Sequence, residues 1–234
     1  MSKETARSPI VRLHNVNKTY SNHGIEVQAL KDCDLSIHRG SLLCITGRSG
    51  SGKSTLLNVI GGLLPPDKDT ESVYIDDKDI YALREPQLTT FRNEHIGFIF
   101  QAFNLIPNLT ALENVVFPLR MLKRSIDDRF IRQLAEKMEV SDRLSFYPDQ
   151  LSGGQQQRIA ILRALAKKPS IILADEPTGN LDRTSSRQLL QLIKQLNKDL
   201  SQTFIIATHD SEVAAIGRER IHVTDGYVEV TGGR

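Results

Sequence analysis

The feature that most constrains this chain is a glycine-rich segment at residues 47–55, with the sequence GRSGSGKST. It follows an apolar run at residues 42–46 and precedes a stretch with helical spacing. In the pattern Gly47-x-x-x-x-Gly52-Lys53-Ser54, glycines let the backbone curl so that successive N–H groups point inward. The helix that follows adds the positive end of its dipole. A loop of this kind grips phosphate groups and requires a buried strand before it and a helix after it.

The loop also carries side chains suited to a nucleotide. Lys53 supplies a positive charge for the β- and γ-phosphates, and the hydroxyl of Ser54 can bind Mg²⁺. The residues of the loop that we expect to bind the nucleotide are Gly47, Arg48, Ser49, Gly50, Ser51, Gly52, Lys53, Ser54 and Thr55.

Apolar strand-like runs alternate with helical segments along the chain, which predicts a mainly parallel sheet covered on both faces. Thr110 and Glu113 form a capping-box pattern at a helix start, and residues 103–168 contain helical patterns without a strong strand. The expected fold class is therefore α/β with an inserted helical part. The expected strands are residues 10–16, 34–38, 42–46, a strand and turn around 72–77, 96–100, 170–175, 203–208 and a closing hairpin at Asp225-Gly226.

Composition excludes several classes of protein. The 234 residues carry a net charge of +2 and no basic run, so we expect no nucleic-acid partner. Cys33 and Cys44 lie in apolar stretches, which favours two buried thiols in a reducing compartment. The polar N-terminus and the lack of a run of ~18 apolar residues predict a cytoplasmic chain that does not cross a bilayer.

Two further segments indicate nucleotide chemistry. The apolar run of residues 171–174 leads into Asp175 and Glu176, at the edge where α/β sheets bind ligands. We expect Asp175 to hold the water shell of Mg²⁺, and Glu176 to orient the attacking water or accept its proton. The segment LSGGQQQR, residues 151–158, has a serine and two glycines before a helical pattern and so resembles a second anion-binding turn.

These segments together, with His209 after the strand at residues 203–208, resemble the nucleotide-binding subunit of an ABC transporter. LSGGQ is the signature motif of that family. The resemblance implies a P-loop NTPase (RecA-like) core at about 8–102 and 169–234, an N-terminal antiparallel β part, and a helical subdomain at about 103–168. All of these would belong to one domain, residues 1–234, with ATP and Mg²⁺ as its ligands.

The resemblance also implies roles for single residues. Tyr20 would stack on adenine, Gln101 would contact Mg²⁺ and the attacking water, and His209 would contact the γ-phosphate. Gln101 would also begin the segment that touches the membrane subunit, and Asp182 would lie in a loop that crosses between subunits. Two chains of this family pair head to tail, so each signature covers the ATP of the other chain. The signature residues are Leu151, Ser152, Gly153, Gly154 and Gln155.

Longer stretches, among them IGFIFQAFNLIPNLTALENV and ADEPTGNLD, resemble the MacB and lipoprotein-release branch. Its members serve permeases that move lipoproteins, peptides or antibiotics, or that transmit force across a membrane. The expected partners are a second copy and an integral membrane permease, which would place the chain at the cytoplasmic face of the membrane. The segment PPDKDTESVYIDDKD departs from the glycine-containing turn of relatives and leaves the local hairpin open. Four apolar residues after Gln101 would either pack the helices or line a groove for the permease: Phe103, Leu105, Ile106 and Leu109.

Three alternative classes fit the sequence less well. Soluble ABC proteins of DNA repair or translation carry long coiled coils or tandem ATPase halves, and this chain has neither a heptad run nor a second half. A small-molecule kinase or GTPase does not account for LSGGQ. A regulatory module that binds ATP without hydrolysing it is disfavoured because Glu176 and His209 are both present.

Overall fold

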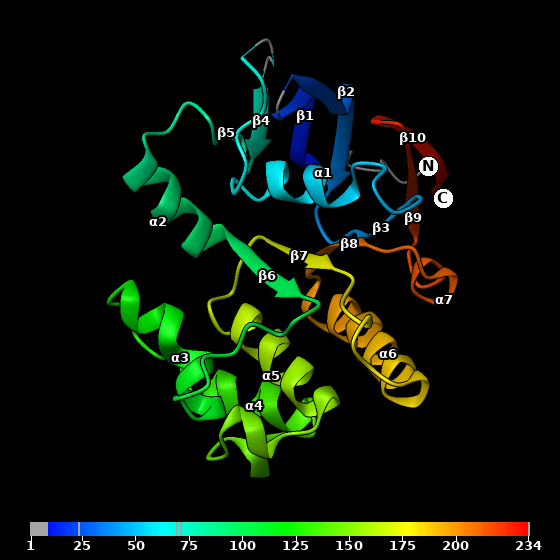
Figure 1. Ribbon diagram of the computed structural model, residues 1–234. Coiled ribbons are helices and arrows are strands. Elements are labelled where there is room, and N and C mark those ends of the chain that lie inside the picture. Colours follow the sequence, from blue (N-terminus) through cyan, green and yellow to red (C-terminus); the bar gives the residue numbers. More distant parts are fainter. Residues whose placement is uncertain (1–8, 23, 69, 71, 234) are drawn as a thin grey trace, which may run out of the picture.

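The computed structural model describes residues 9–22, 24–68, 70 and 72–233 and has an α/β architecture with two sheets (Figure 1). The larger sheet has the strand order β10-β9-β3-β8-β7-β6. All its neighbouring strands are parallel except the closing pair β9 and β10. The predicted mainly parallel sheet is therefore present. Its strands are β3 (Leu42–Thr46), β6 (Ile96–Phe100), β7 (Ile171–Asp175), β8 (Thr203–Ala207), β9 (Glu219–Thr224) and β10 (Tyr227–Gly233).

The second sheet is antiparallel, in the order β2-β1-β4-β5. Its first two strands are longer than predicted, because their pairing continues outward to Asn22 and Ile25, where side chains such as that of Ile25 are exposed and give no apolar pattern. The hairpin β4–β5, left open by the sequence, does form. Residues 69 and 71 of the preceding glycine-free turn lie outside the described residues. The strands are β1 (Pro9–Asn22), β2 (Ile25–His38), β4 (Ser72–Ile75) and β5 (Lys78–Asp79).

The turn between β4 and β5 is made by Asp76 and Asp77. Both are left-handed, with φ angles of 51° and 60°. Aspartate tolerates this conformation better than most residues, which explains how a hairpin forms here without glycine.

The larger sheet is buried on both faces. Along β3, Leu43 packs with one hydrophobic cluster and Leu42 with the other, since successive side chains of a strand point to opposite faces. The first face is covered by α1 (Lys53–Ile60) and the antiparallel sheet, and the second by α5 (Gly153–Ala166) and α6 (Arg183–Leu200) (Figure 1). Because both faces are covered, the carboxyl-terminal ends of the parallel strands are the place left open for a site.

The segment between β6 and β7 is helical, as predicted, with no strand among its residues. Thr110 and Glu113 form the expected capping box, in which Glu113 N donates to Thr110 Oγ1 at 3.3 Å and Thr110 N donates to Glu113 Oε2 at 2.8 Å. The helices share one hydrophobic cluster with the sheet, so they pack on it rather than form a separate core. Besides α5 they are α3 (Ala111–Met121), α4 (Asp128–Lys137) and short 3₁₀ turns at Ser141–Arg143 and Pro148–Gln150.

Two helices were missed by the sequence analysis. The first, α2 (Glu85–His95), begins without a serine, threonine, asparagine or aspartate at its N-cap, and of its residues only Leu88 and Phe91 are buried. The second, α7 (Ser211–Ala214), has only four residues. Within the part of the chain that the structure describes, no helix has the length and apolar character needed to cross a membrane.

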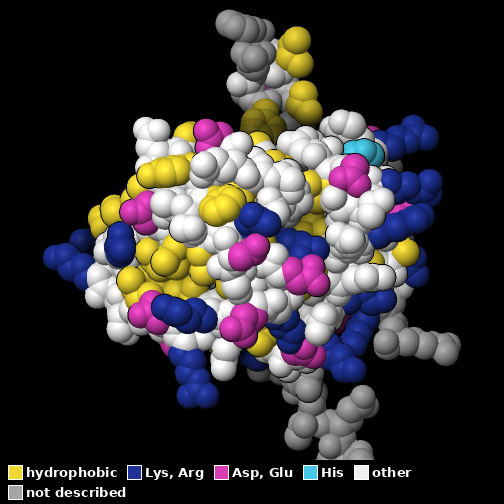
Figure 2. Space-filling model, turned by 90° about the horizontal axis from the view of Figure 1, so that it is seen from below, with side chains coloured by type: hydrophobic (Ala, Val, Ile, Leu, Met, Phe, Trp, Pro, Cys, Tyr) yellow, Lys and Arg dark blue, Asp and Glu magenta, His cyan; other side chains and the backbone are white. Residues whose placement is uncertain are grey.

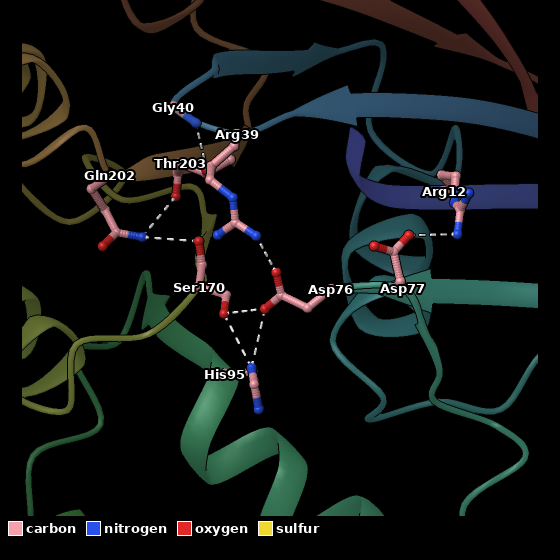
Figure 3. Close-up of polar contacts among 9 residues, drawn as sticks. All are labelled: Arg12, Arg39, Gly40, Asp76, Asp77, His95, Ser170, Gln202 and Thr203. Carbon is pink, nitrogen blue, oxygen red and sulfur yellow. Dashed lines mark hydrogen bonds and ion pairs between the residues drawn. The ribbon is translucent and has the colours of Figure 1, made fainter. Parts of the chain in front are cut away.

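At the amino-terminal ends of the parallel strands, a polar cluster around Asp76 joins the two sheets (Figure 3). Its carboxylate accepts hydrogen bonds from Arg39 and Ser170, and His95 Nδ1 lies 3.2 Å from Asp76 Oδ2. Burial would raise the pKa of Asp76, but the hydrogen bonds from Ser170, Arg39 and His95 outweigh it and hold this pKa below its usual value. The ionised carboxylate therefore ties the antiparallel sheet to the starts of β6 and β7.

Both cysteines are buried and free, as predicted. Burial raises the pKa of Cys33 to about 12 and that of Cys44 to about 11. A thiol that stays protonated behaves as a small apolar side chain, so both residues serve the packing of the core.

Candidate nucleotide site

The glycine-rich loop joins β3 to α1 at the carboxyl-terminal ends of the parallel strands. Gly52 is the N-cap of α1 and has a φ of 113°, a conformation that other residues rarely adopt. A Cβ atom there would also lie 2.3 Å from the carbonyl oxygen of Ala29 in β2. The loop can therefore close over the helix start only because this residue is glycine.

The N-terminus of α1 is open to a ligand. Gly52 provides no side-chain cap, so the first N–H groups of the helix remain available as donors. Lys53 lies mostly buried, and its Nζ donates to the carbonyl oxygens of Gly47 at 2.9 Å and Arg48 at 2.8 Å. These bonds hold the ammonium group inside the loop, where a nucleotide would place its β- and γ-phosphates.

Oxygen groups suited to a divalent cation meet beside the loop. Ser54 Oγ donates to Asp175 Oδ1 at 3.2 Å, so the start of α1 and the end of β7 are in contact. Burial raises the pKa of Asp175. A cation bound beside it would act in the opposite direction and favour the ionised carboxylate. Among the described residues, no group of three or more His, Cys, Asp or Glu side chains is placed to hold a metal ion by itself. A hydroxyl and one carboxylate fit Mg²⁺, because this ion keeps several waters and takes phosphate oxygens as its other ligands.

Glu176 is held in a defined orientation at the end of β7. Its φ of 44° is left-handed, and its carboxylate accepts three hydrogen bonds from the end of β8. The donors are His209 N at 3.0 Å, His209 Nδ1 at 2.6 Å and Thr208 Oγ1 at 3.1 Å. A fixed carboxylate beside a phosphate loop can accept a proton from a water molecule.

His209 therefore contacts the carboxylate that the sequence predicts as the catalytic base. Since the carboxylate accepts, Nδ1 of His209 carries a proton in this contact. Its side chain is 69% exposed, whereas that of Glu176 is 18% exposed. The sequence predicted that both residues lie at the same edge, but not this hydrogen bond.

Ten of the predicted residues line one cleft of about 430 Å³. The hydroxyl groups of Tyr20 and Thr55 lie 3.3 Å apart, so the aromatic ring stands at one end of the loop. Two apolar residues of β2, Val27 and Ala29, also line the cleft and were missed. Val27 pairs with Tyr20 in the β1–β2 hairpin, and extending the predicted strands would have revealed it. The predicted residues are Tyr20, Ser49, Gly50, Gly52, Lys53, Ser54, Thr55, Gln101, Glu176 and His209.

The start of the loop faces a second cleft of about 490 Å³, which contains Gly47 and Arg48. His209 lines both clefts. Ser51 lies in the loop between them, and its buried Oγ has no hydrogen-bond partner.

Gln101 follows β6 and pairs with Asn180 in the loop after β7. Gln101 Nε2 donates to Asn180 Oδ1 at 3.2 Å, and Asn180 Nδ2 donates to the main-chain oxygen of Gln101 at 3.0 Å. The structure therefore brings Gln101 to the same cleft as Ser54 and Glu176. Asn180 was not predicted as a partner, because it lies 79 positions from Gln101 in the sequence.

The signature residues form the start of α5, with Leu151 buried and Ser152 exposed. Gln155 N donates to Ser152 Oγ at 3.3 Å, and Ser152 N donates to Gln155 Oε1 at 2.9 Å, which makes a capping box. The N–H groups of Gly153 and Gly154 are then the free donors of the helix. None of these five residues lines either cleft described above.

Asp182 caps α6 within its own chain. Its carboxylate accepts hydrogen bonds from Thr184 N and Ser185 N, both at 2.9 Å, and from Ser185 Oγ at 2.6 Å. The hydrogen bonds from Ser185 lower the pKa of Asp182. The loop from Glu176 to Asp182 is thus anchored at both ends.

Gln157 connects the signature helix to the ends of β6 and β7, and sequence analysis missed it as well. Its side chain is buried, and Nε2 donates to the carbonyl oxygen of Pro177 at 2.6 Å, with that of Phe100 at 3.5 Å. These two residues are the neighbours of Glu176 and Gln101. The signal available in the sequence was a polar glutamine at a position that the helical period assigns to the apolar face of α5.

Comparisons with known proteins agree with this geometry. A model of the family described as ABC transporter matches residues 30–179. The lipoprotein-releasing system ATP-binding protein LolD 1 of Chlorobium chlorochromatii is 44% identical, over 94% of this chain and 90% of its own length. The macrolide export ATP-binding/permease protein MacB of Syntrophobacter fumaroxidans is 40% identical over 96% of this chain, which matches 32% of that longer protein.

The structure also resembles a solved one. The ATP-binding cassette MJ0796 of Methanocaldococcus jannaschii, described as a dimeric post-hydrolysis state bound to ADP and Pi, has a TM-score of 0.83 and 44% sequence identity. The match covers 96% of this chain and all of that one.

The fold and the loop geometry define a P-loop nucleoside triphosphatase. More narrowly, the chain belongs to the ABC transporter family. It is an ATP-binding subunit that hydrolyses ATP, and the predicted resemblance to the MacB and lipoprotein-release branch is confirmed. These findings favour a transporter subunit over a soluble ABC protein of DNA repair or translation.

Proposed function

We propose that this chain binds ATP with Mg²⁺ in the cleft between the phosphate loop and Glu176, and that its turnover drives a membrane permease. The observation that carries the proposal is the carboxylate of Glu176. Three donors from the end of β8 hold it in the cleft that Lys53 and Ser54 also line. A carboxylate held in the same cleft as the phosphate loop is suited to the hydrolysis of the terminal phosphate.

In the proposed reaction, a water molecule attacks the γ-phosphorus and the bond to the β–γ bridging oxygen breaks. Glu176 orients the water and takes up its proton, and the products are ADP and inorganic phosphate. Lys53 and the N–H groups of α1 stabilise the charge that spreads over the phosphate oxygens. His209 keeps Glu176 in place and offers its exposed ring to the γ-phosphate.

Three side chains would hold Mg²⁺: Ser54, Asp175 and Gln101. All offer oxygen, the ligand that this cation prefers. When bound, the ion neutralises charge on the β- and γ-phosphates.

The signature segment would complete the site of a second copy. Ser152 accepts a bond from Gln155 but retains its own hydroxyl proton, and the N–H groups of Gly153 and Gly154 remain free at the start of α5. These donors suit the γ-phosphate of ATP bound by another chain. The pair would be isologous, with Asp182 near the two-fold axis, and would open after hydrolysis.

The permease surface is proposed on α3 and the segment after Gln101. Leu112, Phe117 and Met121 of α3 are exposed, the last by 68%. Figure 2 views the molecule from the helical side and shows a patch of apolar side chains bordered by charged ones. Apolar side chains that gather on an otherwise charged surface indicate a contact with another protein. Of the four apolar residues after Gln101, Leu105 packs on the core cluster, so it serves the helices.

Through this surface the chain would sit at the cytoplasmic face of the membrane. By its resemblance to LolD and MacB, the permease would export or extract lipoproteins, peptides or antibiotics, or transmit force.

The test compares Phe117→Asp and Met121→Asp with Val230→Asp, an equally charged change at an exposed position of β10. We expect the isolated variants to hydrolyse ATP like the original chain. The two α3 variants should lose co-purification with the membrane partner, whereas Val230→Asp should keep it. Retention of the partner by both α3 variants would contradict the proposed surface.

A further inference from the structure

Gln101 is hydrogen-bonded to the loop between β7 and α6. Its Nε2 donates to Asn180 Oδ1, and Asn180 Nδ2 donates back to the main-chain oxygen of Gln101. Two hydrogen bonds of opposite direction thus join one asparagine to one glutamine. This arrangement fixes more than the position of Gln101.

The pair fixes which end of the Gln101 carboxamide is free. Because Nδ2 of Asn180 must donate to a carbonyl oxygen, Oδ1 of Asn180 is the atom that faces the Gln101 side chain. That oxygen can only accept, so it selects the NH₂ group of Gln101. Oε1 is left as the free end of the carboxamide, and it is the only atom of this side chain that can bind a cation.

Gly179 contributes through the space it leaves. A Cβ atom there would lie 2.7 Å from Nε2 and 2.9 Å from Cδ of Gln101, so the carboxamide lies directly against the glycine backbone. Gly179 N donates to the carbonyl oxygen of Glu176 at 3.0 Å. This hydrogen bond fixes the position of Gly179, and with it that of the Gln101 carboxamide, relative to Glu176.

We infer that Gly179 and Asn180 are positioning residues that turn Oε1 of Gln101 toward the Mg²⁺ of bound ATP. The inference rests on the proposed role of Gln101 as a ligand of the ion. An exposed carboxamide without such a partner takes either orientation, and the flipped one offers NH₂ to a cation. Asn180 also lies two residues before Asp182, so a movement of this loop changes the metal site.

The experiment measures nucleotide affinity without turnover. The dissociation constant of a non-hydrolysable ATP analogue is determined by calorimetry in Mg²⁺ and again in EDTA. The EDTA value divided by the Mg²⁺ value gives the part of the affinity that depends on the metal. We expect Asn180→Ala to reduce this ratio by about three- to tenfold, the net worth of one hydrogen bond, and to leave the EDTA value unchanged. Gln191→Ala, which removes an exposed carboxamide on α6, is the matched control and should change neither value.

A second variant separates orientation from simple support of the loop. In Gln101→Glu the two carboxylate oxygens are equivalent, so no orientation remains to be chosen. Asn180→Ala should then cause no loss of the ratio in this background, because Oδ1 of Asn180 has no NH₂ group left to select; this is the non-additivity expected of residues that act through one another. An equal loss in both backgrounds would overturn the inference.

The same measurements separate this inference from the function it rests on. If Gln101→Ala leaves the ratio unchanged, Gln101 is not a metal ligand, and both statements are wrong. If Gln101→Ala lowers the ratio and Asn180→Ala does not, the ligand role holds and the positioning role is refuted.

Discussion

Replacing Glu176 with glutamine separates chemistry from binding and folding. The structure allows the cost to folding to be worked out. Oε1 can keep both bonds from His209, and the new NH₂ group can donate to Thr208 Oγ1 in place of the bond it gave. Thr208 Oγ1 already accepts from Asp210 N at 3.0 Å and has a second lone pair for this purpose.

Only the orientation of one hydroxyl changes, so we expect a loss of about 1 kcal/mol or less in the free energy of unfolding. The effect on hydrolysis should be far larger. An amide cannot take a proton from water, and the loss of a general base typically lowers the rate by about 10² to 10⁴-fold, or about 3 to 5 kcal/mol in the barrier.

The assay is phosphate release at saturating ATP and Mg²⁺, together with analogue binding by calorimetry and thermal unfolding. Binding of the analogue should match that of the original chain, and the free energy of unfolding should fall by no more than about 1 kcal/mol. A rate within tenfold of the original, in a folded variant that binds the analogue normally, would refute the assignment of Glu176 as the base.

Three further changes test other parts of the site and fold. Tyr20→Ala should raise the dissociation constant for ATP by about 5- to 140-fold, which is the contribution of stacking one base on an aromatic ring. The original chain should hydrolyse GTP at a rate comparable to that of ATP, because stacking on Tyr20 and contact with Val27 select no particular base. A strict preference of the original chain for ATP would contradict this. Lys53→Ala should weaken analogue binding by at least about tenfold, since its ammonium group no longer meets the phosphates; unchanged calorimetric affinity would remove the loop assignment. Asp76→Asn should lower the free energy of unfolding at pH 7 by about 1 kcal/mol. Because the folded pKa of Asp76 is lowered, its contribution is complete above the unfolded pKa of about 3.9 and is lost as the pH falls through the lower folded value; urea titrations whose difference persists in strong acid would contradict the role.

The central part of the fold follows from local patterns. Short apolar runs at β3, β6, β7 and β8 are buried on both faces, and the sequence marks them because nothing along them needs to be polar. The same rule places Glu176 and Gln101 at one edge, because parallel strands present their ends together.

The outer strands and α2 do not follow from such patterns. The outer half of β2 has exposed side chains, so its apolar period is absent where the hairpin extends to the nucleotide cleft. Helix α2 buries Leu88 and Phe91 only, and its start has Arg84 where a capping side chain was expected. Their positions are decided by contacts with the rest of the fold.

The contacts that orient the site are equally hidden in the sequence. Asn180 meets Gln101 across 79 positions and His209 meets Glu176 across 33, and each pair depends on the order of strands in the sheet. A glycine such as Gly179 shows its purpose only when the side chain lying on it is seen. Motifs therefore identify the residues, and the fold decides their partners.

We propose that the signature of one copy completes the ATP site of another. Light scattering of Glu176→Gln with ATP and Mg²⁺, alone and combined with Gly154→Asp, tests it directly. A Cβ at residue 154 has ordinary contacts of 3.5 Å with Ser185, so the aspartate fits the fold but places a negative charge where the partner's γ-phosphate is expected. We expect an ATP-dependent doubling of mass for Glu176→Gln and a monomer that still binds ATP for the combined variant. Equal dimerisation of both, or a monomer in both, would contradict it.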